Sequence, residues 1–314
     1  MKKQWIKYLC DPVDKSEIKL EKVFEFDGKR IIRGTLKSQS GNVYQIKEGI
    51  PILLDKRSQT LKSVESFGYE WNEFDYDYGQ KSWMEDIIKP SVGSMDYFKN
   101  KIIVDCGAGS GRQSSWMAEA GAKLVVAVEL SDSVHTAAKK ATRHADNVFL
   151  IQADIAHLPL KKTAFYDLIY CVNVIQHTQN ETKTLIELSS LMTKKSRMIF
   201  NIYLHQNRYF IIRLVGGLRQ LTSELPYKTL KQSLYLPAVF IFILSKFRIV
   251  SIGRSFRETW LNMYDLFGGH SYQKFYTEEE VQRMISSARL IVEKRTKYVF
   301  VCARNLPKRR GKNI

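Results

Sequence analysis

The chain has 314 residues, 44% of them hydrophobic, and its 49 lysines and arginines exceed its 32 acidic residues to give a net charge of +17. This length predicts one catalytic core with a small appendage, and two domains at most. The four cysteines form no C-x-x-C pair, which argues against a disulfide framework and a zinc ribbon and favours a reducing cytoplasm.

Membrane-spanning and secretory signals are weak. Residues 1–9 contain no apolar stretch of the signal-peptide kind. The longest apolar run, 234–244, falls short of the ~20 residues needed to cross a bilayer. We therefore expect a cytoplasmic protein, and we expect the basic tail 305–314 to be solvated.

Residues 1–55 read as a small β-rich module, with strands at 18–26, 30–36 and 42–46. Segments 9–12, 41–46 and 49–54 resemble the zinc-ribbon-like modules related to tRNA-methyltransferase activator subunits, in which cysteine pairs hold zinc. Only Cys10 is present, and Asp14 stands where a second cysteine would be expected. A four-ligand site cannot be assembled from these residues, so we predict no metal.

Residues 56–100 begin with a polar linker and continue into an aromatic stretch. Helical spacing places Phe67, Trp71 and Phe74 on one face. This face either packs on the following domain or covers a bound ligand.

An alternation of strands and helices then predicts an α/β core over 101–204 and 277–304, with a parallel sheet and right-handed crossovers. Thr277 opens the last helix with a capping box, and a hairpin closes the core. The expected strands are 102–106, 123–128, 148–152, 166–172 and 198–203, the expected helices are 112–120, 132–143 and 180–192, and the hairpin strands are 290–294 and 297–303. Ser131 is the expected N-cap of the helix at 132–143.

The loop after the first core strand carries three alternate glycines, Gly107, Gly109 and Gly111, which allow a ligand to approach the backbone. A dinucleotide fingerprint would need its third glycine at position 112, where Arg112 stands. The loop is similar to the first motif of the class I S-adenosylmethionine-dependent methyltransferase family, and the similarity extends over 67–203 and 277–303.

This resemblance implies a seven-stranded Rossmann-like sheet of order 3-2-1-4-5-7-6 with an antiparallel seventh strand, and S-adenosyl-L-methionine as the cofactor. It implies that Asp105 orders the glycine turn, that Glu129 accepts the ribose hydroxyls, and that Asp154 accepts the adenine amino group. The cofactor-binding residues that it implies are Trp71, Asp105, Gly107, Ala108, Gly109, Gly111, Glu129, Leu130, Asp154, Ile155 and Asn173.

Two histidines are candidate general bases for a hydroxyl acceptor, His177 after the fourth strand and His270 before the last helix. For His177 the alternative is a cap on the helix that starts near Asn180. For His270 the alternative is an ordinary loop residue.

The insertion 205–276 is the expected site of acceptor specificity. Its apolar segments 208–215 and 234–247 are flanked by basic residues, and they form either a lid or a peripheral membrane contact through 205–250. We expect a methyltransferase of a bacterial biosynthetic pathway that acts on the oxygen or nitrogen of a small-molecule, saccharide or lipid-linked acceptor.

Two alternatives stay open, an RNA methyltransferase and an inactive cofactor-binding adaptor. The positive net charge favours an RNA substrate, but the sequence has no RNA-binding module and no Asn-Pro-Pro-Tyr signature. Cys171 could act as a nucleophile, but its place at a strand end makes a buried packing residue the stronger expectation. The complete glycine and acidic set of the core argues against the adaptor.

Overall fold

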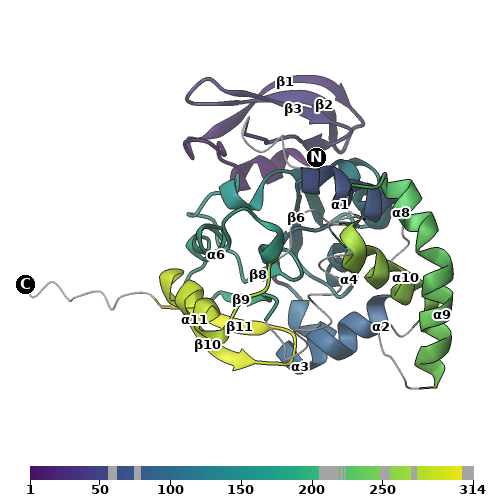
Figure 1. Ribbon diagram of the computed structural model, residues 1–314. Coiled ribbons are helices and arrows are strands. Elements are labelled where there is room, and N and C mark those ends of the chain that lie inside the picture. Colours follow the sequence, from purple (N-terminus) through teal and green to yellow (C-terminus); the bar gives the residue numbers. More distant parts are fainter. Residues whose placement is uncertain are drawn as a thin grey trace, which may run out of the picture.

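The computed structural model describes residues 1–55, 62–73, 79–204, 219, 222, 224–247, 255–269 and 274–305. A seven-stranded sheet forms the centre, a four-stranded sheet lies over one end of it, and a helical segment lies along one side (Figure 1). Among the residues described, no helix combines the length and the hydropathy that crossing a bilayer requires.

The first 51 residues contain the 3-10 helix η1 (Lys3–Tyr8) and, after it, the four strands of the antiparallel N-terminal sheet. Its strands in spatial order are β1 (Ile18–Phe26), β2 (Ile31–Ser38), β3 (Val43–Lys47) and β4 (Ile50–Pro51). Gly28 and Gly41, at φ values of +86° and +95°, allow the two tight turns between the long strands. The resemblance of this sheet to zinc ribbons stays a hypothesis.

A buried carboxylate organises the loop that carries Cys10. Asp11 is fully buried, and its Oδ1 accepts the Val13 amide at 2.7 Å while its Oδ2 accepts the Asn42 amide at 2.9 Å and the Tyr44 hydroxyl at 3.1 Å. Cys10 beside it is buried, and burial raises the pKa of its thiol to about 11. Hydrogen bonds to Asp11 therefore join this loop to β3.

Short helices lead from the linker into the core. They are α1 (Lys62–Glu73), α2 (Gln80–Trp83), the π-helical turn η4 (Met84–Ile88), α3 (Lys89–Val92) and the 3-10 turn η5 (Met95–Phe98). Trp83 anchors them, because its buried indole donates to the Tyr170 hydroxyl at 2.7 Å and stacks on Phe98.

The central sheet has the order β7-β6-β5-β8-β9-β11-β10, which is the predicted 3-2-1-4-5-7-6 order. Only parallel pairs join β7 through β9, whereas β11 runs antiparallel to β9, as predicted. The fold-class prediction is confirmed. The strands are β5 (Ile102–Cys106), β6 (Leu124–Glu129), β7 (Val148–Gln152), β8 (Leu168–Cys171), β9 (Arg197–Phe200), β10 (Leu290–Arg295) and β11 (Phe300–Arg304).

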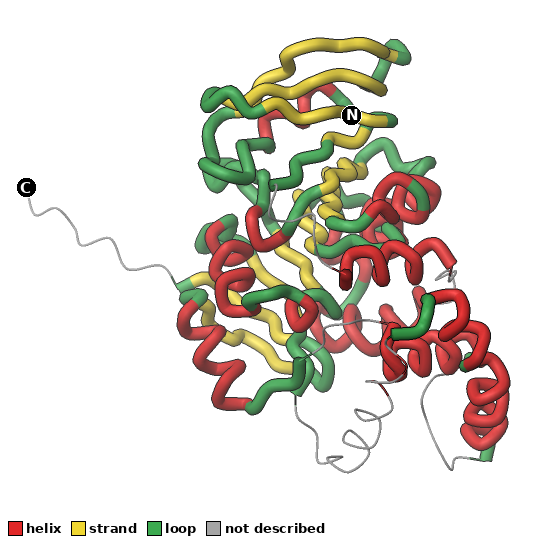
Figure 2. The backbone as a smooth tube through the Cα atoms, turned by 45° about the horizontal axis from the view of Figure 1, so that its top comes forward, coloured by secondary structure: helices red, strands yellow, loops and turns green. Residues whose placement is uncertain are grey.

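Both faces of this sheet are covered, as Figure 2 shows. Alternate residues of β6 enter different cores: Leu124, Val126 and Val128 pack on one face, and Val125 and Ala127 pack on the other. This double burial explains why the strand is a continuous apolar run. The core helices and turns are α4 (Arg112–Glu119), η6 (Asp132–His135), α5 (Ala137–Thr142), η7 (Ile155–His157), η8 (Ile175–His177), α6 (Glu181–Ser190) and α11 (Glu278–Ser287).

Two local predictions have different outcomes. The Thr277 capping box is confirmed, since its hydroxyl accepts the Glu280 amide and the Glu280 carboxylate accepts the Thr277 amide. The continuous helix at 132–143 is wrong, because the chain forms the 3-10 turn η6, breaks at Thr136 and resumes as α5. Ser131 precedes η6 but caps nothing with its side chain, since its hydroxyl donates to Glu129 instead.

The helical segment of the insertion consists of α8 (Tyr227–Ser233), α9 (Tyr235–Lys246), α10 (Phe256–Tyr264) and the π-helical turn η9 (Asp265–Gly269). It has a small apolar core of its own, formed by Leu230, Leu234, Ala238, Leu261 and Tyr264. Residues 205–218, including the apolar segment 208–215, lie outside the described residues.

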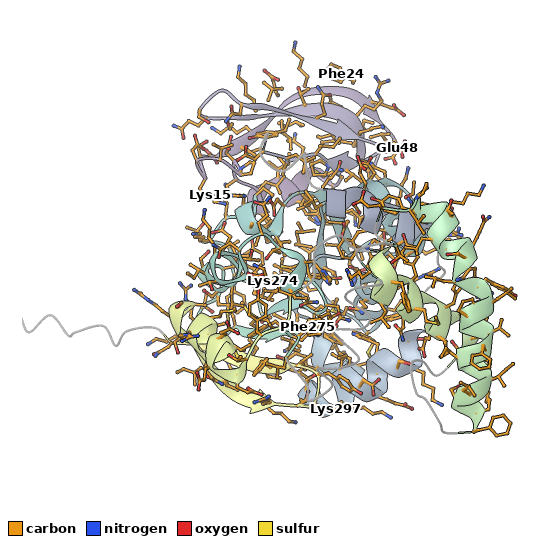
Figure 3. All side chains as sticks on the ribbon, viewed as in Figure 1. Lys15, Phe24, Glu48, Lys274, Phe275 and Lys297 are labelled. Atoms are coloured by element: carbon orange, nitrogen blue, oxygen red, sulfur yellow. The ribbon has the colours of Figure 1, made fainter. Side chains whose placement is uncertain are left out.

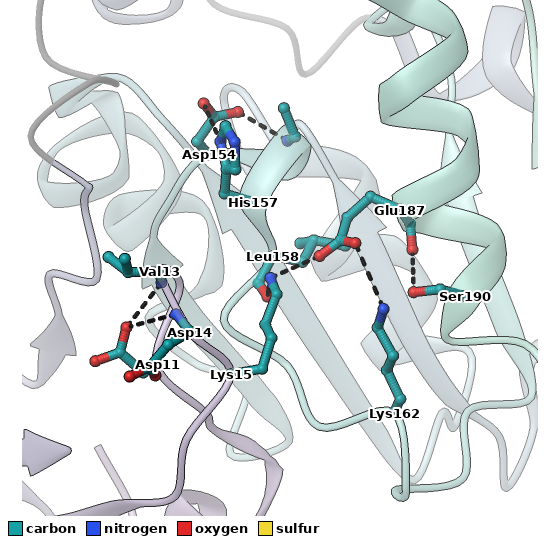
Figure 4. A network of polar contacts seen from close by, with 11 residues as sticks. Asp11, Val13, Asp14, Lys15, Asp154, His157, Leu158, Lys162, Glu187 and Ser190 are labelled. Atoms are coloured by element: carbon teal, nitrogen blue, oxygen red, sulfur yellow. Dashed lines mark hydrogen bonds and ion pairs between the residues drawn. The ribbon is translucent and has the colours of Figure 1, made fainter. Parts of the chain in front are cut away.

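The N-terminal sheet is attached to the loop that follows β7 (Figure 4). The Lys15 ammonium donates to the Leu158 carbonyl at 2.8 Å and to the Glu187 carboxylate at 2.6 Å. Main-chain bonds join Cys10 to Pro159, Tyr8 to Lys161 and Leu53 to Gln152. The segment 152–161 is thus bonded to the N-terminal sheet at both of its ends.

Candidate active site

The glycine loop after β5 lies at the carboxyl edge of the parallel strands, where ligands of open α/β sheets bind. Gly107, Gly109 and Gly111 have φ values of +81°, +53° and +72°. A Cβ added to Gly107 would come within 2.4 Å of the Val174 side chain, and one added to Gly111 would come within 2.7 Å of the Ala138 backbone. Conformation and space therefore both require glycine in this loop.

Glu129 ends β6 and is bonded directly to the glycine loop. One carboxylate oxygen accepts the Gly109 amide at 2.8 Å, and the other accepts the amide and the hydroxyl of Ser131 at 2.9 and 2.7 Å. Two carboxylate oxygens offer about four acceptor positions, so this arrangement leaves room for a further donor. The side chain is buried and lines the main cavity of the site.

Asp105 lies behind the loop. It is buried, and its carboxylate accepts the Ser114 hydroxyl, which joins the end of β5 to α4. The pKa of this carboxyl is raised to about 7, mainly because the group is buried; the Ser114 hydrogen bond opposes this rise and the Glu129 charge adds to it. Asp105 is absent from the cavity lining, so its structural effect is on the strand-to-helix turn.

The cavity has a volume of about 320 Å³. Its walls come from the ends of β5, β6, β7 and β8 and from α1. The lining residues are Phe67, Trp71, Gly107, Glu129, Leu130, Ser131, Asp154, Ile155, Ala156, His157, Asn173, Val174, His177, Thr178, Gln179 and Lys183. Glu129 is buried in this lining, whereas Gln179 and Lys183 are exposed at its rim.

Asp154 and Ile155 follow β7 and line the cavity. The Asp154 carboxylate accepts the Ala156 amide at 2.8 Å, which caps η7, and lies 3.5 Å from His157 Nδ1. Because segment 152–161 is bonded to the N-terminal sheet, that sheet also holds this part of the cavity wall.

Asn173 lines the cavity after β8 in a left-handed conformation, with φ at 62°. Its backbone amide donates to the Asn201 side chain at 2.6 Å, and the Asn201 amide donates back to its side-chain oxygen at 2.7 Å. This reciprocal pair joins the ends of β8 and β9. Asn201 was not among the predicted residues, because no local pattern links two positions on neighbouring strands.

The aromatic face of α1 covers the loop. The Trp71 ring lies so close to Gly109 that an added Cβ would meet it at 2.8 Å. Phe67 stacks on Trp71 with ring centroids 6.4 Å apart, and both rings line the cavity. The other predicted member of this face, Phe74, lies outside the described residues.

His177 lines the cavity between two aromatic rings, 5.0 Å from the Phe67 centroid and 6.0 Å from that of Tyr203. The helix cap belongs to Asn180, whose side chain accepts the Lys183 amide at 2.9 Å. The alternative reading of His177 as that cap is therefore wrong. The other candidate base, His270, lies outside the described residues.

The structure thus brings most of the predicted residues together around one cavity and sets a few apart. Trp71, Gly107, Glu129, Leu130, Asp154, Ile155, Asn173 and His177 line it, whereas Asp105, Ala108, Gly109 and Gly111 do not. Sequence reasoning did not single out the lining residues His157, Gln179 and Lys183, which lie on turns and helices just after predicted positions. Cys171 is fully buried, and burial raises the pKa of its thiol well above the ordinary range, which argues against a nucleophile.

Comparison with known proteins agrees with this geometry. Residues 104–200, which hold most of the cavity wall, match the model of a family described as a methyltransferase domain. Protein arginine N-methyltransferase 1 of Schizosaccharomyces pombe is 30% identical over 114 residues, covering 32% of this chain and 33% of that protein. A ubiquinone biosynthesis O-methyltransferase of Rickettsia canadensis is 22% identical over 167 residues, covering 52% of this chain and 69% of that protein.

Among solved structures, magnesium protoporphyrin IX methyltransferase of Synechocystis, with bound SAH, is 15% identical and has a TM-score of 0.45, covering 76% of this chain and 93% of that one. The chain spans about a third of the length of the arginine methyltransferase that it matches. Residues 104–200 match the model of a methyltransferase domain, and the central sheet has the strand order that the sequence predicted for this family.

Proposed function

We propose that this chain, whose residues 104–200 are a methyltransferase domain, transfers a methyl group from S-adenosylmethionine to the oxygen or nitrogen of a small-molecule, saccharide or lipid-linked acceptor. The observation that carries the proposal is the cavity at the glycine loop, where a buried carboxylate, backbone exposed by glycine and an aromatic lid meet.

The residues fit this cofactor. Glu129 would accept the ribose hydroxyls with its remaining acceptor positions, and Asp154 and Ile155 would meet the adenine. Gly107 would let the methionine part lie against the main chain, and Trp71 and Phe67 would cover it. When bound, the cofactor supplies an electrophilic methyl group.

Methyl transfer depends mainly on alignment in a dry site, so the chain has to orient the acceptor and exclude water. The aromatic rings of α1 would exclude water from the cofactor side. His177, which faces the cavity, would accept the proton of a hydroxyl or ammonium acceptor. The exposed rim residues Gln179 and Lys183 would meet the acceptor as it enters.

The acceptor class is testable with a labelled methyl donor and a fractionated extract of the source cell. We expect label in the small-molecule, saccharide or lipid fractions. Label in nucleic acid would instead favour the RNA methyltransferase, and donor binding without any transfer would favour the inactive adaptor.

A pair of glycine variants tests the cofactor site by calorimetry. Gly109→Val is expected to abolish donor binding, because its side chain would displace Trp71. Gly28→Val is the matched control, since Gly28 also has a positive φ but an added Cβ meets nothing within 4 Å. Unchanged affinity in Gly109→Val would refute the assigned site.

A further inference from the structure

The outer face of α9 is apolar and exposed. Leu236, Phe240, Ile243 and Phe247 are 74%, 62%, 50% and 72% exposed, and they follow one another at spacings of four, three and four residues. This spacing places them on one side of the helix. We call these four residues the α9 stripe.

The opposite face of α9 packs against other residues of the helical segment. Ala238 is fully buried there, and Tyr235 and Phe242 contact the Phe256 ring of α10 at 5.4 and 6.0 Å. Figure 1 shows α9 at the edge of the molecule, with α10 between it and the core. The stripe is thus not needed for packing α9 on the protein.

The charged residues of α8 and α9 are all basic, although Lys231 is paired with Glu73 of α1. Between residues 225 and 257 the sequence contains six lysines and arginines and no aspartate or glutamate. Lys228 and Lys246 are exposed, and the Lys246 ammonium lies 4.7 Å from the Phe242 ring, at the end of the helix that carries the stripe. A partner of the stripe therefore has to accept both apolar side chains and positive charge.

We propose that α9 docks on an anionic lipid surface, with the stripe among the acyl chains and the basic side chains at the headgroups. Apolar residues on one face and cations beside them are the features of helices that lie in a membrane interface. A helix of 12 residues is about 18 Å long. It would lie along the surface, not across the bilayer.

A second copy of the chain fits the stripe less well. Stripe-to-stripe pairing would bring two segments of the same positive charge together, without an acidic residue between 225 and 257 to offset them.

The docked helix would be connected to the lid over the cavity. The α8 residue Lys231 forms an ion pair with Glu73 of α1 at 2.8 Å, and Tyr227 of α8 contacts Tyr69 of α1 with ring centroids 5.6 Å apart. The other face of α1 carries Phe67 and Trp71 into the cavity. If the proposed function holds, α9 would bring the cavity close to lipid-linked acceptors; docking itself does not depend on methyl transfer.

The test is co-sedimentation of the whole chain with vesicles of phosphatidylcholine alone and of phosphatidylcholine with phosphatidylglycerol. We expect binding to the anionic vesicles that weakens as salt is raised. Replacing the stripe by serine (Leu236→Ser, Phe240→Ser, Ile243→Ser, Phe247→Ser) should reduce the partition coefficient by roughly tenfold or more, because its apolar area no longer enters the lipid.

The chain offers a matched control on the N-terminal sheet. Phe24 and Phe26 are 61% and 56% exposed, and Figure 3 shows Phe24 at its outer surface. Glu21 and Glu25 lie on the same strand. Phe24→Ser with Phe26→Ser should leave vesicle binding unchanged, and both variants should keep the donor affinity of the wild type, which reports an intact core.

Three results would overturn the proposal. They are the absence of binding to anionic vesicles, equal loss of binding in the stripe and control variants, and a concentration-dependent dimer that the stripe variant abolishes while vesicle binding is unaffected. If the chain binds anionic vesicles but transfers no methyl group, only the proposed function is contradicted.

Discussion

The N-terminal sheet and the helical segment α8–α10 are both additions to the same core, but they are attached by different interactions. The sheet is joined by main-chain bonds to segment 152–161, by the Lys15 ion pair and by Trp5, which stacks on Phe149 at 5.0 Å. The helical segment contacts α1 through side chains: Tyr69 of α1 meets the Tyr227 ring and packs against the apolar core of the segment, and Lys231 pairs with Glu73.

This difference has a consequence for the cavity. Backbone bonds fix the position of a segment more tightly than ring contacts do, because their geometry is directional. The adenine side of the proposed cofactor site, with Asp154, is therefore held rigidly by the N-terminal sheet. The helical segment, by contrast, contacts the lid helix α1 through side chains. We therefore expect substitutions that weaken the attachment of the N-terminal sheet to have larger effects than substitutions that weaken the attachment of the helical segment.

The largest effect is expected from Trp5→Ala. Its ring is buried between the N-terminal sheet and the core, so the free energy of unfolding should fall by about 3–5 kcal/mol in denaturant titrations. Trp260→Ala removes a partly buried ring of the helical segment, so the free energy of unfolding should fall by less than in Trp5→Ala. An equal or larger cost at Trp260 would contradict the difference between the two attachments.

Lys15→Met tests whether the N-terminal sheet positions the cavity wall. We expect the dissociation constant of S-adenosylmethionine to rise on the order of fivefold, which corresponds to about 1 kcal/mol of coupling. The control is Lys162→Met, because Lys162 pairs with the same Glu187 carboxylate at 3.7 Å, whereas the bond to the Leu158 carbonyl comes from Lys15. Equal losses of cofactor affinity, or a loss that only follows stability, would show that Lys15 has no positioning role.

Lys231→Met addresses the attachment of the helical segment to α1. The ion pair with Glu73 is partly exposed, so the free energy of unfolding should change by less than about 1 kcal/mol. Lys228→Met is the control, because it removes an exposed lysine of the same helix. The difference between the two variants in thermal denaturation gives the contribution of the ion pair. A loss similar to that of Trp5→Ala would mean that the helical segment is anchored as firmly as the sheet.

The smallest effect concerns pH. Hydrogen bonds from Lys29 and Arg30 of the N-terminal sheet lower the pKa of Asp146, an exposed residue just before β7, to about 2. A carboxyl whose folded pKa lies below its unfolded value of about 3.9 stabilises the fold above that value, and the contribution is lost as pH falls toward 2. Asp146→Asn should therefore lower the denaturation midpoint at pH 7 and leave it unchanged near pH 2. A difference that persists at pH 2 would exclude this linkage.

The sheet and most of the cavity were predictable because the signals are local. Continuous apolar strands, the three glycines and the acidic residues at strand ends each identify a position without knowledge of the rest of the fold. Asn201 and Lys183 could not be found this way. Asn201 reaches the lining residue Asn173 only through the pairing of β8 with β9, and Lys183 reaches the cavity through the direction of α6. The break at Thr136, where φ is −119° and ψ is −85°, was missed because no Gly or Pro marks it in the sequence.

The pairing of Ile52 and Leu53 with Gln152 also covers the end of β7, the outer strand on this side of the central sheet. An open edge strand offers unpaired amides and carbonyls to other chains and promotes aggregation. Here that exposure is transferred to β1, whose register against β2 is interrupted by bulges and whose outward residues include lysines and glutamates. Irregular register and charged side chains make such a border a poor template for intermolecular strands.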